Sequence, residues 1–144
     1  MRRYLVIANQ TLTSEQLQQE LLLRVESSAE ECLFHFLVPN TAKQDYSPGW
    51  SDASPETLHG AQRACRRLQA VMELVRAAGA CALGALGDPD PMKAVEVQMQ
   101  CSAYDEIIVS MLPETTSRWF NLDLPSRIAR AVPIPVTTIT AKAT

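Results

Sequence analysis

Five short, largely apolar runs alternate with segments of helical periodicity, and this alternation constrains the fold more than any other feature. The runs cover residues 3–9, 32–38, 81–86, 105–109 and 134–140. Strands that are apolar throughout, and not only at every second residue, are typical of a sheet covered on both faces. Alternation of such strands with helices indicates a mostly parallel sheet.

Helix-start signals stand in each of the four intervening segments. Thr13, Ser54, Asp90 and Asp123 can each accept a hydrogen bond from the first turn of a helix. A chain of 144 residues is the usual size of one domain. The sequence therefore predicts a single α/β domain over residues 1–144: a doubly wound, mostly parallel five-stranded sheet with helices on both faces.

The charge balance argues against a dedicated nucleic-acid binder. The chain carries 13 Lys and Arg against 16 Asp and Glu, a net charge of −3, whereas such binders normally show a basic footprint. Hydrophobic residues make up 47% of the chain, which is too many for a disordered protein. No segment approaches the ~20 apolar residues of a membrane-spanning helix. We therefore expect neither nucleic acid nor a membrane among its partners.

The four cysteines are Cys32, Cys65, Cys81 and Cys101. They form no CxxC pair, so the spacing of a zinc site is absent. Each lies inside an apolar-periodic segment, with Cys65 on the apolar stripe of the second helix. This placement predicts buried free thiols and a cytoplasmic protein.

Ligands of doubly wound sheets bind beyond the carboxyl ends of the strands, at the point where the strand order reverses. The residues at and after those ends are the candidate ligand-binding residues. They are Asn9, Thr11, Val38, Gly87, Ser110, Thr115, Thr116 and Ser117.

No catalytic or metal-binding constellation accompanies this candidate pocket. The sequence lacks the phosphate-loop, hydrolase-elbow and H-E-x-x-H motifs. His35 lies inside a core strand without a partner motif, which predicts a hydrogen-bonded structural residue. Asp88 and Asp90 could in principle act in acid–base chemistry or bind a metal, but a turn and a helix cap explain both. We therefore expect no enzymatic activity.

Two further features allow a functional and a structural interpretation. Arg63, Arg66 and Arg67 could hold a phosphate, but a basic cluster on an exposed helix face is usually only solvated. The polar segment 40–54 carries Trp50 and could be a lid or a plain crossover loop.

Five segments in matching order resemble the motifs of the universal stress protein family. They lie at residues 4–11, 34–39, 84–89, 105–109 and 133–136, and the resemblance covers nearly the whole chain. Gly87-Asp88-Pro89, for example, is similar to the Gly-Asp-Pro turn of the family. The resemblance implies a doubly wound α/β fold and a homodimer, often formed through the last strand.

The chain departs from the family in the phosphate-binding motif. Nucleotide-binding members carry Gly-x-x-Gly followed by Gly-Ser or Gly-Thr, whereas here Ser110 and Pro113 stand near the first two glycines and Leu122-Asp123 near the last pair. Proline has no N–H to donate, and Asp123 adds negative charge. Asn9 replaces the acidic residue that ends the first strand.

The hydroxyls of Thr115, Thr116 and Ser117 could nevertheless bind a ligand in another way, in place of the missing glycines. We expect no cofactor, with ATP or AMP as the candidates if one binds.

Three functions follow from these observations. The first is a dimeric regulatory or interaction module in stress response, with an unknown protein partner and without ordinary ATP binding. The alternative is a protein that binds an adenine nucleotide or another small ligand in a non-standard pocket at the strand ends. An enzyme of the adenine-nucleotide α-hydrolase-like group is the least favoured. Ile134, Val136 and Ile139 would support dimerisation through the last strand, which we expect at a sheet edge.

Overall fold

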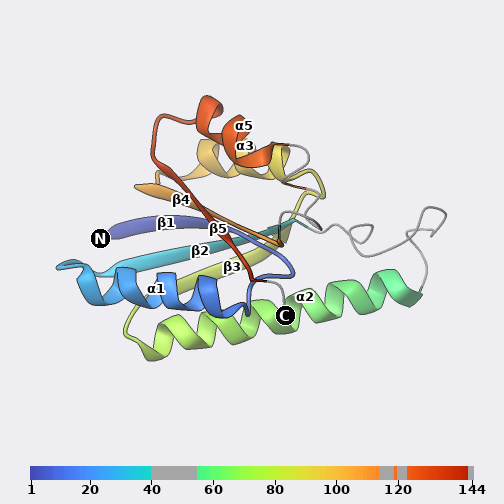
Figure 1. Cartoon of the computed structure of the whole chain (residues 1–144), viewed down its shortest axis with the longest axis horizontal. Helices are drawn as coiled ribbons and strands as arrows, with labels where there is room; N and C mark the ends of the chain where they lie inside the picture. The colour runs from blue at the N-terminus through green and yellow to red at the C-terminus, as the bar shows by residue number, and fades with distance from the viewer. Residues whose placement is uncertain (40–54, 114–118, 120–122, 143–144) are drawn as a thin grey trace.

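The computed structural model describes residues 1–39, 55–113, 119 and 123–142. Strands and helices alternate along the chain as the sequence predicts (Figure 1). The elements are β1 (Arg2–Ile7), α1 (Glu15–Ser27), β2 (Cys32–Pro39), α2 (Pro55–Ala77), β3 (Cys81–Gly87), α3 (Pro91–Cys101), β4 (Glu106–Met111), α5 (Leu124–Ala131) and β5 (Val136–Thr140).

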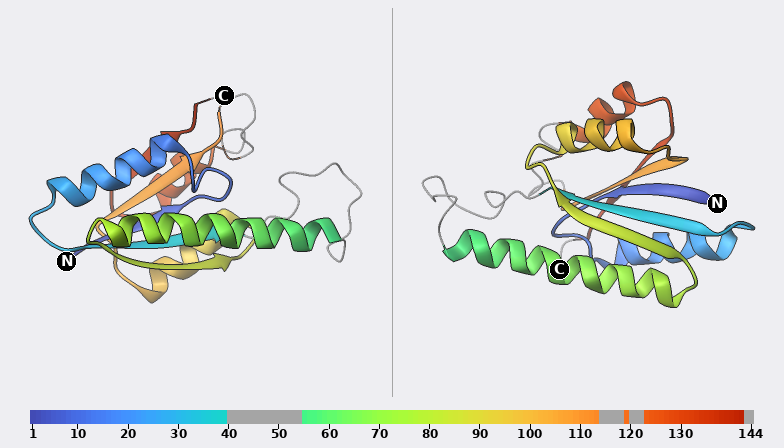
Figure 2. Two further views of the ribbon diagram at one scale, coloured as in Figure 1. Left: turned by 90° about the horizontal axis from the view of Figure 1, so that it is seen from below. Right: turned by 180° about the vertical axis from the view of Figure 1, so that it is seen from behind.

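All neighbouring strands of the sheet are parallel, in the order β3-β2-β1-β4-β5. The chain therefore moves outward from β1 to β3 and returns to the other side of β1 with β4. The reversal between β1 and β4 is the topological switch point, where a ligand is expected. Helices α1 and α2 cover one face of the sheet and α3 and α5 the other (Figures 1 and 2). The predicted fold class is confirmed.

Each face of the sheet has its own hydrophobic core. Tyr4 and Val6 of β1 turn toward α1 and α2, and Leu5 and Ile7 turn toward α3 and α5. All four are at most 4% exposed. Because both faces of β1 are buried, the strand is apolar at consecutive positions.

The helix caps follow the sequence at some positions and differ at others. Asp90 caps α3, since its carboxylate accepts a hydrogen bond from the Met92 N–H at 3.0 Å. The cap of α1 is Ser14 and not Thr13. Asp123 occupies the capping position of α5 but makes no side-chain cap bond; it has a left-handed backbone with φ of 54°.

All four cysteines are free, but the prediction that all are buried is wrong. Only Cys32 is buried. The buried stripe of α2 runs through Ala64, Leu68, Val71 and Val75, which leaves Cys65 on the solvent side. Cys81 and Cys101 are also exposed, on β3 and on the last residue of α3.

None of the described helices is long and apolar enough to cross a membrane.

Candidate functional site

Buried polar side chains gather at the switch point. In the described part of the chain, the polar residues classed as buried are Asn9, Thr11 and Ser110, at 8%, 4% and 1% exposure. Asn9 and Thr11 follow the carboxyl end of β1, and Ser110 lies in the carboxyl-terminal half of β4. Buried polar groups must be hydrogen-bonded to be tolerated, so their partners determine what this site can still bind.

Asn9 is held by a residue from α2 and by the end of β2. Nη2 of Arg67 donates to the Asn9 side-chain oxygen at 2.8 Å, and Nε of Arg67 donates to the Asn9 main-chain oxygen at 3.1 Å. The Asn9 amide nitrogen in turn donates to the main-chain oxygen of Pro39 at 2.9 Å. Both polar atoms of the Asn9 side chain therefore have a partner within the protein.

Thr11 and Ser110 form the second contact of the site. Their hydroxyl oxygens are 2.6 Å apart and share a hydrogen bond. This bond links the loop after β1 to β4 across the switch point.

The other predicted pocket residues contribute less. The Val38 side chain is fully buried in the core beneath α2. Gly87 is closely packed, because a Cβ there would lie 2.9 Å from Cδ1 of Leu37. Thr115, Thr116 and Ser117 lie outside the described residues, as does the 40–54 segment with Trp50. The structure thus brings together Asn9, Thr11 and Ser110.

Sequence reasoning missed the role of Arg67. The sequence favours a solvated cluster for Arg63, Arg66 and Arg67, and Arg63 and Arg66 are indeed exposed. Arg67 is half-buried because it lies beside the buried Leu68, and its long side chain reaches from the helix to the strand ends. An arginine next to the apolar stripe is the signal that could have indicated this contact.

His35 belongs to a separate polar cluster under α3. Its Nδ1 lies 3.0 Å from the Tyr104 hydroxyl, which also accepts a hydrogen bond from the Gln98 amide at 2.8 Å. Burial lowers the pKa of His35. The predicted hydrogen bonding of His35 within its strand is confirmed. Among the residues that the structure describes, no group of three or more His, Cys, Asp or Glu side chains could hold a metal ion.

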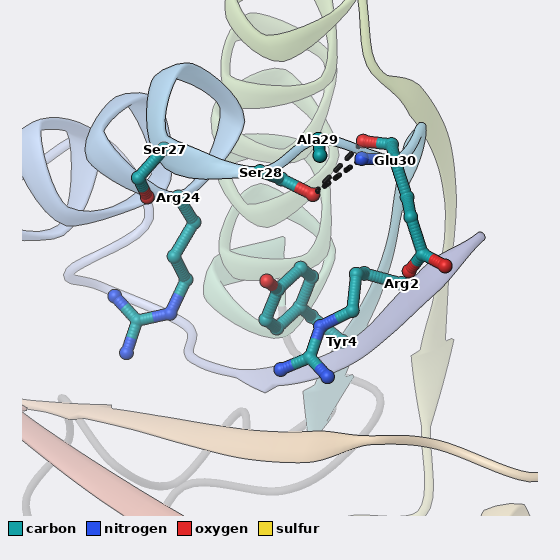
Figure 3. A pocket seen from close by; sticks show the side chains of 7 residues that line it. All are labelled: Arg2, Tyr4, Arg24, Ser27, Ser28, Ala29 and Glu30. Carbon is teal, nitrogen blue, oxygen red and sulfur yellow. Dashed lines mark hydrogen bonds between the residues drawn. The ribbon is translucent and has the colours of Figure 1, made fainter.

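A shallow pocket of about 380 Å³ lies at the opposite end of the sheet, where β1 begins (Figure 3). The guanidinium carbons of Arg2 and Arg24 lie 5.9 and 6.0 Å from the centre of the Tyr4 ring, on either side of it. Arg24 is already paired with Glu20 and Glu106, each at 2.7 Å. The carboxylates of Glu20, Glu106 and the lining residue Glu30 together outnumber the two guanidinium groups, so the pocket offers no excess of positive charge for an anion.

Fold and site together define a doubly wound α/β protein in which polar side chains at the switch point bind one another. No protein-family model and no curated protein sequence matches the chain. Solved structures do match it, among them several universal stress proteins.

The protein from Archaeoglobus fulgidus has a TM-score of 0.63 and 14% identity, over 99% of this chain and 94% of that chain. A family member from Arabidopsis thaliana with AMP bound has a TM-score of 0.58 and 14% identity, over 99% of this chain and 94% of that chain. A universal stress protein in complex with cAMP has a TM-score of 0.59 and 16% identity, over 98% of each chain. The chain therefore has the universal stress protein fold.

Proposed function

We propose that this protein is a universal-stress-protein-like module that does not bind ATP in the ordinary way and acts as a dimeric regulatory or interaction protein in stress response. One observation carries the proposal: the polar groups at the switch point are hydrogen-bonded to one another. A nucleotide that took the place of Arg67 and Pro39 at Asn9 would have to break these bonds, and otherwise it could use only the second N–H and the second oxygen lone pair of the amide. Each such bond typically contributes about 0.5–1.5 kcal/mol.

The phosphate side of the site supports the same proposal. Pro113 follows β4 and has no N–H that could approach a phosphate. Asp123 adopts a left-handed backbone, which glycine adopts most readily, yet it brings an exposed carboxylate to the start of α5. That carboxylate would repel a triphosphate at a helix N-terminus, which otherwise attracts anions.

Calorimetric titration of the nucleotide-stripped protein tests the proposal. We expect no binding heat for ATP with magnesium, for AMP or for adenosine at sub-millimolar affinity. A saturable ATP signal would overturn it. The Arg67→Ala variant, with the exposed Arg66→Ala as its matched control, then shows whether the Arg67–Asn9 contact is what keeps a nucleotide out.

Binding of an adenine nucleotide or another small ligand is the second candidate. It is favoured by the similar structures that contain AMP and cAMP. In this chain the ligand would have to displace the internal partners of Asn9, Thr11 and Ser110, or use the N–H, O–H and lone pairs that these bonds leave over. Binding of AMP or adenosine that tightens in Arg67→Ala would support this candidate, because the loss of Arg67 frees the Asn9 oxygen.

The remaining parts of the proposal concern partners and location. We place the protein in the cytoplasm, assign it no reaction, and expect a homodimer through the edge of β5. Of the three apolar residues near that edge, Ile139 lies in one core, while Val136 and Ile134 pack partly against the other. Such pairing would therefore rely mainly on the β5 backbone. Light scattering that finds only the 15.9 kDa monomer at high concentration would contradict it.

A further inference from the structure

The other edge of the sheet carries an exposed apolar face. β3 is hydrogen-bonded to β2 on one side and is an edge strand of the described sheet. Its sequence, from Cys81 to Gly87, contains no charged residue. Cys81, Leu83 and Ala85 are exposed, Leu83 to 53%. Natural edge strands usually carry charges or bulges that block pairing with another strand, and β3 carries no charge.

The register of β2 with β1 shows which backbone groups of β3 face outward. The main-chain oxygens of Glu31 and Leu37 accept hydrogen bonds from the β1 side. Odd-numbered residues of β2 therefore turn toward β1, and even-numbered ones toward β3. In a parallel pair, a residue whose N–H and C=O point toward the neighbouring strand bonds to the residues before and after its register partner on that strand. The register partner itself therefore points its own N–H and C=O away from the pair. The partners of the even-numbered residues are Ala82, Gly84 and Leu86, whose N–H and C=O groups thus face away from the sheet.

A contact from α2 agrees with this assignment. Nη2 of Arg76 donates to the main-chain oxygen of Ala82 at 2.8 Å. A carbonyl oxygen has two lone pairs, so Ala82 can still accept a bond from another strand.

These outward groups match a second copy of the same strand. With a twofold axis at Gly84, Ala82 of one copy lies opposite Leu86 of the other, and Gly84 lies opposite itself. The three outward-facing residues then become the hydrogen-bonded pairs of an antiparallel ladder. On the α3 side of the sheet, each exposed Leu83 lies beside the small Ala85 of the other copy.

The charges at the two ends of β3 are complementary in the same arrangement. Arg76 lies at Ala82. Asp88 follows Leu86 by two residues; its carboxylate lies 4.0 Å from Nζ of Lys93, a long ion pair that leaves the Asp88 side chain 38% exposed. Because Ala82 of one copy opposes Leu86 of the other, Arg76 faces the end that carries Asp88. By symmetry this opposite-charge contact occurs twice.

We propose that the outer edge of β3 binds β3 of a second copy, in an antiparallel pair centred on Gly84. This surface lies at the opposite edge of the sheet from β5, so it is independent of the dimer expected from the family. A self-complementary patch is what a twofold interface requires. An extended peptide from another protein could also add a strand here, but it would need an acidic residue facing Arg76 and a basic residue facing Asp88, whereas a second copy supplies both by symmetry.

Sedimentation equilibrium tests the proposal, in a Thr138→Lys background that blocks the β5 edge through an exposed position. We expect a reversible dimer whose dissociation constant rises at least about tenfold in Leu83→Lys. Leu23→Lys is the matched control, since Leu23 is 55% exposed on α1 and should leave the dimer unchanged. A monomer at every concentration, or equal dissociation constants for Leu83→Lys and the control, would overturn the proposal.

Charge reversal provides an independent test in the same background. Arg76→Asp and Asp88→Arg should each weaken self-association, because each homodimer would bring like charges together. An equimolar mixture of the two variants restores both opposite-charge contacts, so we expect a heterodimer in native mass spectrometry. If the mixture shows no preference for the heterodimer, then β3 edges do not pair in this register. Capture of an added peptide without self-association would assign the edge to another protein.

Discussion

A half-buried arginine from a neighbouring helix lies near each end of β1: Arg24 of α1 at the amino end and Arg67 of α2 at the carboxyl end. The two arginines have different partners. At the amino end, Arg24 contacts two carboxylates, those of Glu20 and Glu106. At the carboxyl end, Arg67 contacts the side-chain and main-chain oxygens of Asn9, both of which are neutral. The amino end therefore joins α1 to β4 by charge, and its strength depends on pH and salt. The carboxyl end fixes the geometry of the switch point, and this difference separates a charged network from neutral contacts at the position where the fold would place a ligand.

The largest effect should come from breaking the amino-end network. Glu106 pairs with Arg24 and also accepts a hydrogen bond from Thr137, and its side chain is only 14% exposed. We expect Glu106→Ala to lower the free energy of unfolding by about 2–4 kcal/mol, because the half-buried guanidinium loses the more buried of its two carboxylate partners and Thr137 loses its acceptor. Urea denaturation measures the change. Glu20→Ala is the control: Glu20 is 42% exposed, so we expect less than about 1 kcal/mol. Equal losses in the two variants would contradict this account.

Acid should weaken the same network. Although burial alone would raise the pKa of Glu106, hydrogen bonds from Arg24 and Thr137 hold it below the ordinary value of 4.5. The folded state therefore binds the proton less readily than the unfolded chain does. The stabilisation is present above pH 4.5 and is lost as the pH falls through the folded pKa. In thermal melts against pH, Glu106→Gln should remove this part of the acid dependence. An unchanged pH profile would count against the network.

A smaller effect is expected at the carboxyl end. Arg67→Ala removes two hydrogen bonds to Asn9 and should cost about 1–2 kcal/mol in the free energy of unfolding. High salt should change the contribution of these two bonds little, because the bonded oxygens are neutral, whereas the cost of Glu106→Ala should shrink in salt. Chemical denaturation at low and high salt makes the comparison, with Arg66→Ala as the control. The same salt dependence for both variants would remove the distinction between the two ends.

The smallest effect should come from the hydroxyl pair. Thr11→Val leaves the buried Ser110 hydroxyl without its partner and should cost about 1 kcal/mol. Ser110→Ala alone should cost a similar amount. The double variant should cost less than the sum, since neither hydroxyl is then left buried without a partner. A double-mutant cycle that gives strict additivity would show that the 2.6 Å contact contributes nothing.

The sheet was predictable because its strands are buried on both faces. The apolar runs at residues 3–9 and 105–109 identify β1 and β4 directly, and the order of helices and strands then allows few topologies. The exact first residue of a helix and the exact face that it buries were harder to predict. Thr13 and Ser14 are both good caps, and only the final backbone course decides between them. Cys65 lies one residue from the buried Ala64, so a shift of one position reversed its exposure.

The candidate site was predictable in position but not in its contacts. Asn9, Thr11 and Ser110 follow from the rule that ligands lie at the ends of the strands. The hydrogen bond from Arg67 spans 58 residues of sequence, and no local pattern encodes such a partner. Tertiary packing of α2 against the sheet creates it, because the buried Leu68 fixes the direction in which its neighbour points.

Nuclear magnetic resonance of the Asn9 side-chain amide and the Arg67 Nε–H group tests the central claim most directly. Both groups are donors in the contacts that fill the switch point. Addition of ATP with magnesium to millimolar concentration should leave both signals where they are, since the protein's own groups hold them. A saturable shift of both signals, with loss of the bond between Arg67 and Asn9, would show that a nucleotide displaces these contacts and would contradict the claim.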